Sequence, residues 1–153
     1  MKYPTDKTKD KALEQKLLTR IKWLVVYFIV AVAISGITAF PVYTELQMIK
    51  QRGMIDGDGL MATWLSTVYN GVTDTYSKYP FLFYGYDWLA FAHLMIAALF
   101  FAVYKNPVKN KFIVDVGIFC CIAIVPMAVI GSSIRGIPFF HTLVDCSFGA
   151  LGL

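Results

Sequence analysis

Six ionisable side chains stand within or beside long apolar stretches of this sequence. Ionisable groups inside a membrane are energetically costly, so they usually pair with one another or mark a functional site. Helical spacing from the ends of the apolar stretches places these groups at similar depths, in the outer third of a bilayer. We therefore predict one polar cluster, either structural or ligand-binding, formed by Glu45, Asp87, His93, Arg135, His141 and Asp145.

Three kinds of chemistry are open to this cluster. In the first, Arg135 pairs with Glu45 or Asp145 while His141 hydrogen-bonds Asp145, and these pairs fix how the helices pack. In the second, His93 and His141 ligate haem b axially, or hold a transition metal together with Asp145. In the third, the cluster forms a pocket for a quinone, a lipid headgroup or an anionic solute, with Arg135 as anchor and His93 as proton partner.

The composition is that of a membrane protein. Of the 153 residues, 58% are hydrophobic and 16% are charged. Ordinary soluble domains carry roughly 45–50% apolar and about 25% charged residues. This excess of apolar residues excludes intrinsic disorder and a disulfide-rich secreted scaffold, and it argues against an ordinary soluble domain.

The apolar stretches predict an all-α integral membrane bundle of four transmembrane helices. A helix needs about 20 apolar residues to cross ~30 Å of hydrocarbon, and four stretches come close to that length. A basic amphipathic lead-in precedes them, and a long outer loop separates the first from the second. The lead-in is 1–22, and the membrane domain is 23–153, with spans at about 23–44, 86–104, 112–134 and 136–153 and an outer loop at 45–87.

The basic residues predict the orientation. Of the 14 Lys and Arg residues, seven precede the first span and three lie in the short connection 105–111. Basic residues concentrate on the cytoplasmic side of a membrane. We therefore predict a bacterial inner (cytoplasmic) membrane protein with both termini in the cytoplasm. Its expected partners are membrane lipid and a membrane-protein partner or a second copy of the chain, and no nucleic acid, because no nucleic-acid-binding motif accompanies the charge.

The outer loop is too long to lack structure. Asp58 is a candidate N-cap, and apolar residues recur at helical spacing over 60–69. Asn70-Gly71 or the later Pro80 would end this helix. We predict an amphipathic helix that lies along the outer membrane surface.

An aromatic run follows this helix, from Tyr79 to Trp88. Tyr and Trp gather at membrane interfaces, which predicts an aromatic belt at the entrance to the second span. The same side chains could instead line a pocket for a flat apolar ligand such as a quinone.

Small residues at four-residue spacing predict close contacts between spans. Ala31 with Ser35 is one such pair, and Cys146 with Ala150 is another.

Five strings of residues are distinctive when they are taken together. They are Gly36–Glu45 (GITAFPVYTE), Tyr79–Leu82 (YPFL), Tyr86–His93 (YDWLAFAH), Ile134–Phe140 (IRGIPFF) and Asp145–Gly149 (DCSFG). Together they resemble a family of small, uncharacterised multi-span membrane proteins found mainly in Bacteroidetes-type bacteria. The resemblance covers most of the chain from about residue 30 and implies a membrane location, without a specific activity. An aromatic residue often stands in that family where this chain has His141, which counts against a haem held by two histidines.

The residues favour an accessory or ligand-binding component of the membrane without catalytic activity or a cofactor of its own. No nucleophile triad, phosphate-binding loop or zinc-protease motif occurs in the sequence. The alternative is a haem-, metal- or quinone-linked redox component that uses His93 and His141.

Overall fold

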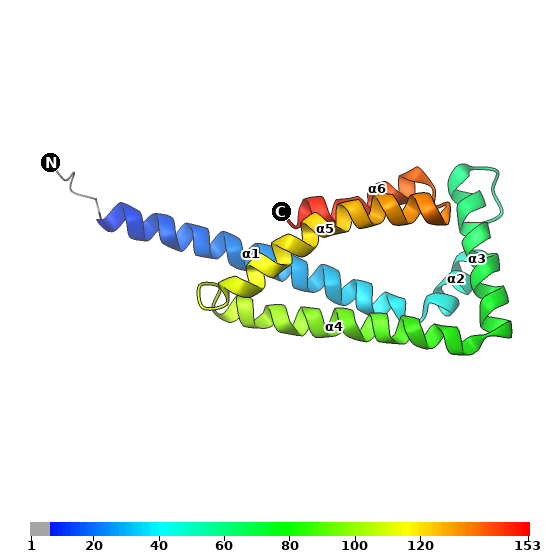
Figure 1. Cartoon of the computed structure of the whole chain (residues 1–153), viewed down its shortest axis with the longest axis horizontal. Coiled ribbons are helices and arrows are strands. Elements are labelled where there is room, and N and C mark those ends of the chain that lie inside the picture. The colour runs from blue at the N-terminus through cyan, green and yellow to red at the C-terminus, as the bar shows by residue number, and fades with distance from the viewer. Residues whose placement is uncertain (1–6) are drawn as a thin grey trace. The chain divides into compact units, whose positions relative to one another are not determined.

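The protein is built of helices. A computed structural model describes residues 7–153, with side chains from Lys9 onward, and this part of the chain contains no strand (Figure 1). The predicted all-α class is confirmed. The helices are α1 (Lys7–Ala39), α2 (Val42–Gln51), α3 (Leu60–Lys78), the 3-10 helix η1 (Pro80–Phe83), α4 (Tyr84–Lys105), α5 (Lys111–Arg135) and α6 (Phe139–Leu151).

Three of these helical segments are long and apolar enough to cross a membrane. They are α1, the continuous segment Pro80–Lys105 that joins η1 to α4, and α5. In their most apolar stretches, only 11%, 22% and 17% of the residues are buried by the rest of the protein. Apolar side chains exposed over such lengths need lipid or another protein around them. These helices are therefore candidate membrane spans, and the predicted second and third spans coincide with α4 and α5.

The first predicted span differs from α1 at both ends. The helix runs without a break from Lys7 to Ala39, so the described part of the lead-in is helical and continuous with the span. The span also ends at Ala39 and not at 44, because Pro41 has no N–H to continue the helix and disfavours helical backbone at Phe40. Residues 1–6 of the lead-in lie outside the described residues.

The predicted fourth span, 136–153, forms the short helix α6. Its 13 residues extend about 20 Å, which falls short of the ~30 Å of hydrocarbon that a crossing requires. Four complete crossings are therefore not confirmed.

The described chain divides into two compact units. Unit 1 comprises Met1–Val30 with Ala98–Leu153, and unit 2 comprises Ala31–Ala97. The first therefore holds most of α1, the end of α4, and α5 with α6. The second holds the end of α1, then α2, α3 and η1, and the start of α4. The six residues of the predicted cluster are shared between them.

Within unit 2, α2 and α3 pack against each other around a small core. Leu46, Ile55 and Tyr69 are buried there, and partly buried aliphatic side chains from both helices surround them. The Tyr69 hydroxyl donates a hydrogen bond to Gln47 Oε1 at 3.2 Å, and Lys50 Nζ lies 4.5 Å from the centre of the Tyr69 ring. A helical hairpin thus occupies much of the predicted outer loop. The sequence analysis did not predict its first helix, α2.

The hairpin turns at Gly53, whose φ of 69° is the left-handed conformation that glycine tolerates best. Its N–H donates to Lys50 O at 2.8 Å, and Met54 N–H donates to Ile49 O at 3.3 Å. This pair of bonds satisfies the last carbonyls of α2 in the manner of a Schellman cap.

The predicted loop helix corresponds to α3, with two differences. Its N-cap is Gly59, with no side-chain capping bond, so the assignment of Asp58 as N-cap is wrong. The helix passes through Asn70-Gly71 and ends just before Pro80, the later of the two predicted stops. Part of its apolar stripe, at Leu65 and Val68, packs on the core with α2, so a position flat on the membrane surface is not confirmed.

Within unit 1, α5 and α6 lie side by side and run in opposite directions (Figure 1). The connection between them turns at Gly136, whose φ is 66°, and Ile137 N–H donates to Ser132 O at 3.0 Å. Closer to the middle of α5, Gly149 packs against the Cys121 backbone carbonyl. Also within unit 1, the rings of Phe28 and Phe100 meet with centroids 4.5 Å apart.

Candidate functional site

Three of the predicted polar residues lie at the α5–α6 corner of unit 1. Arg135 is exposed in the last turn of α5, where a cation interacts favourably with the helix dipole. His141 and Asp145 lie one turn apart on α6, with Nε2 and Oδ1 separated by 3.9 Å. That distance is longer than a hydrogen bond, so the predicted hydrogen bond between them is not confirmed. Among the described residues, no ion pair joins Arg135 to Asp145.

The other three polar residues lie in unit 2. Glu45 is half-buried in the first turn of α2, and Asp87 is exposed in the first turn of α4, where a carboxylate also stabilises the helix dipole. His93 follows Asp87 about 9 Å further along α4. A pairing of Glu45 with Arg135, which belongs to unit 1, stays a prediction.

The ring of His93 is held by its own helix. Its Nδ1–H donates to the Leu89 carbonyl at 2.7 Å, which leaves the lone pair on Nε2 in the neutral ring. The Cβ of His93 also lies beside Gly36 of α1. A residue larger than glycine at position 36 would not fit there unless the neighbouring atoms shifted. This histidine is thus fixed in position and tautomer, as a ligand or a proton acceptor must be.

No metal centre stands out in the part of the chain that the structure describes. Over residues 7–153, no group of three or more His, Cys, Asp or Glu side chains is close enough together to hold a metal ion. The predicted set also divides between the units, with His93 in unit 2 and His141 and Asp145 in unit 1.

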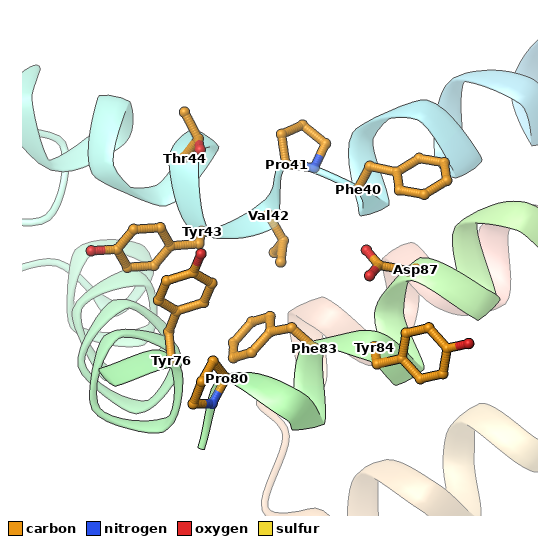
Figure 2. A pocket seen from close by; sticks show the side chains of 10 residues that line it. All are labelled: Phe40, Pro41, Val42, Tyr43, Thr44, Tyr76, Pro80, Phe83, Tyr84 and Asp87. Carbon is orange, nitrogen blue, oxygen red and sulfur yellow. The ribbon is translucent and has the colours of Figure 1, made fainter. Parts of the chain in front are cut away.

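Unit 2 contains a cavity of about 310 Å³. It lies where the turn after α1, the end of α3 and the start of α4 meet, and it includes Asp87, one of the predicted site residues. Figure 2 shows the Asp87 carboxylate directed toward the space between Phe40, Val42 and Phe83, while the Tyr84 hydroxyl points away from it. The lining residues are Phe40, Pro41, Val42, Tyr43, Thr44, Tyr76, Pro80, Phe83, Tyr84 and Asp87.

Aromatic rings in mutual contact form one wall of this cavity. Tyr43 of α2 stacks on Tyr76 of α3, with ring centroids 4.2 Å apart and planes 8° from parallel. Phe83 of η1 meets Tyr76 edge-on at 5.1 Å and stacks on Tyr86 at 5.4 Å. Such contacts stabilise one another beyond their buried area, so the wall is preorganised.

The sequence indicated part of this cavity. The aromatic run from Tyr79 to Trp88 includes Phe83, Tyr84 and Asp87, and a pocket was one of its two interpretations. Tyr43 and Tyr76 carried no such signal, because the first was assigned to the end of a span and the second followed the end of the predicted apolar stripe. Only the folding of α2 onto α3 brings their rings together.

Comparison with known proteins gives no relatives: no family model, curated protein or solved structure matches this chain. The family resemblance therefore stays a prediction, and the arguments below rest on the chain's own residues.

Proposed function

We propose that this chain is a small polytopic protein of the bacterial inner membrane that acts as a non-catalytic accessory or ligand-binding component. The observation that carries the proposal is the cavity in unit 2, where aromatic faces and one carboxylate line a space of about 310 Å³. Ligand sites in proteins are concave spaces in which apolar walls are combined with a few directed polar groups, and this cavity combines aromatic rings with the Asp87 carboxylate.

The membrane topology in this proposal has three crossings, by α1, α4 and α5. The basic residues before α1 and in the connection after α4 support a cytoplasmic position for both. The α2–α3 hairpin and the cavity then belong to the outer face. Helix α6, too short to cross, returns into the membrane along α5, as apolar helices of 10–14 residues do in re-entrant or buried segments.

The topology predicts one-sided labelling. In a variant whose three natural cysteines are replaced by alanine, Asp58→Cys should react with a membrane-impermeant maleimide in intact spheroplasts. Lys109→Cys, placed in the connection after α4, is the matched control and should react only after the membrane is permeabilised. Labelling of Lys109→Cys but not Asp58→Cys in intact spheroplasts would reverse the proposed orientation.

The ligand-binding role can be tested by photocrosslinking in cells. A benzoyl-phenylalanine in place of Phe83, which lines the cavity, should give an adduct of defined small-molecule mass after irradiation. The same amino acid in place of Phe81 is the control, because Phe81 lies in the same 3-10 helix, is 70% exposed and does not line the cavity. Identical adducts at both positions, or none at position 83, would contradict a ligand site.

The alternative, a redox component, draws support from one observation. Because Nδ1 of His93 is hydrogen-bonded to the Leu89 carbonyl, Nε2 is the ring nitrogen left to bind a ligand. A Soret band in the purified protein that disappears in His93→Ala would favour this alternative over the non-catalytic role.

A further inference from the structure

The residues that line the cavity in unit 2 include one carboxylate and no basic side chain. We propose that this cavity binds an alkylammonium group, quaternary or primary, carried by a free solute or by a lipid headgroup. The inference rests on the ligand-binding role proposed above and names the chemical class of the ligand. Three features of the cavity support it: its aromatic wall, its carboxylate and its size.

The aromatic wall attracts cations. Ring faces carry partial negative charge, and an ammonium group within about 6 Å of a ring centroid is attracted to it. Tyr43, Tyr76 and Phe83 all line the cavity, and their stacked and edge-on contacts fix the rings in place. Quaternary ammonium groups are also weakly hydrated, because their methyl groups donate no hydrogen bonds to water, so they lose little hydration when they contact rings.

The carboxylate of Asp87 supplies the full charge. Figure 2 shows it directed into the space, and no Lys, Arg or His is among the residues that line the cavity. Within residues 7–153, no basic side chain forms an ion pair with Asp87. An anionic ligand would be repelled there. A quinone would also bind poorly, because its carbonyls and the carboxylate are all hydrogen-bond acceptors.

The size of the cavity suits a headgroup. Its volume of about 310 Å³ lies at the low end of the ~300–1,000 Å³ range of small-molecule sites. A trimethylammonium or ethanolamine group fits within this volume. A substituted quinone with its isoprenoid tail is larger and would need a longer apolar groove.

The test uses the full-length protein in an uncharged maltoside detergent. Choline and tetramethylammonium should bind saturably by isothermal titration calorimetry. The neutral carbon isostere of choline, in which a tert-butyl group replaces trimethylammonium, should bind at least about tenfold more weakly, because it has the same shape without the charge. This comparison needs no variant, so it stands even if a substitution disturbs folding.

A pair of variants assigns the charge to one residue. Asp87→Asn should weaken choline binding about tenfold, while Asp58→Asn, which removes a carboxylate outside the cavity in the same unit, should leave the affinity unchanged. Equal binding of choline and its neutral isostere, or unchanged affinity in Asp87→Asn, would overturn the proposal. Absence of saturable choline binding in both detergent and phosphatidylglycerol nanodiscs would overturn it as well.

Nanodiscs of different composition distinguish the two sources of the ammonium group. If the ligand is a lipid headgroup, choline should bind in phosphatidylglycerol nanodiscs and be displaced when phosphatidylethanolamine or phosphatidylcholine is added. If the ligand is a free solute, the lipid should make no difference. An adduct at position 83 together with failure of all ammonium probes would refute the ligand class alone, whereas loss of both results would refute the ligand-binding role itself.

Discussion

Replacing Gly149 with alanine is expected to lower the melting temperature of the purified protein by about 10 °C. A Cβ at this position would lie 2.5 Å from the Cys121 carbonyl oxygen and 3.3 Å from a methyl group of Val125. The first obstacle is backbone, so a rotamer change cannot relieve it, and α6 must move away from α5. Overpacking costs about 1–3 kcal/mol, and a backbone clash belongs at the upper end of that range.

The matched control is Gly131→Ala in the same helix pair. A Cβ on Gly131 meets nothing within 4 Å, and alanine is a better helix former than glycine by about 1 kcal/mol. Gly131→Ala should therefore leave the melting temperature unchanged or raise it slightly. Thermal unfolding of both variants followed by circular dichroism in detergent checks the expectation. If the two variants have the same melting temperature, the close packing of α6 on α5 is wrong.

The substitution Gly36→Val should have a comparable effect in unit 2, with a loss of about 3 kcal/mol. A Cβ on Gly36 would stand 2.9 Å from the Ala90 carbonyl oxygen and 3.0 Å from His93 Cβ. The end of α1 is therefore seated directly on α4. Phe40 lies in the turn just after α1, and Asp87 lies on α4 one turn before this contact. Separating the two helices would therefore also displace two residues of the cavity.

This prediction has a functional readout as well as a thermal one. Gly36→Val should lose choline binding along with stability, whereas Gly71→Val, at an exposed position of α3 with open space around it, should retain both. Unfolding and titration calorimetry on the same preparations measure the two effects. Retention of full stability in Gly36→Val would show that α1 and α4 do not meet at this glycine.

The sequence analysis did not predict that the glycines at these two contacts pack against a neighbouring helix. Gly36 begins one of the strings that carry the family resemblance, and Gly149 ends another. The prediction of close contacts instead chose Cys146 with Ala150, one residue beyond Gly149, because small residues at four-residue spacing were the only available signal. Which small residue faces a neighbour depends on how the helices rotate against each other, and a single sequence does not specify that rotation.

What the sequence determined by itself is the helical class and the extent of α4 and α5. Charged residues bracket both apolar stretches, and helices satisfy their own backbone hydrogen bonds, so local composition suffices to place them. It also supplied Asp87 as a candidate site residue, together with the aromatic run beside it. The basic residues gave an orientation that rests on counting alone and stays a prediction.

The tertiary structure decided the α2–α3 hairpin and the cavity. Pro41 separated α2 from α1, the α2–α3 hairpin formed around Leu46 and Tyr69, and that packing brought Tyr43 onto Tyr76 beside Asp87. The side chains that line the cavity come from α2, α3, η1, α4 and the turn after α1, so their meeting depends on long-range packing. Hydropathy and spacing describe one segment at a time. They therefore indicated some of the residues that line the cavity but did not predict that these residues lie together.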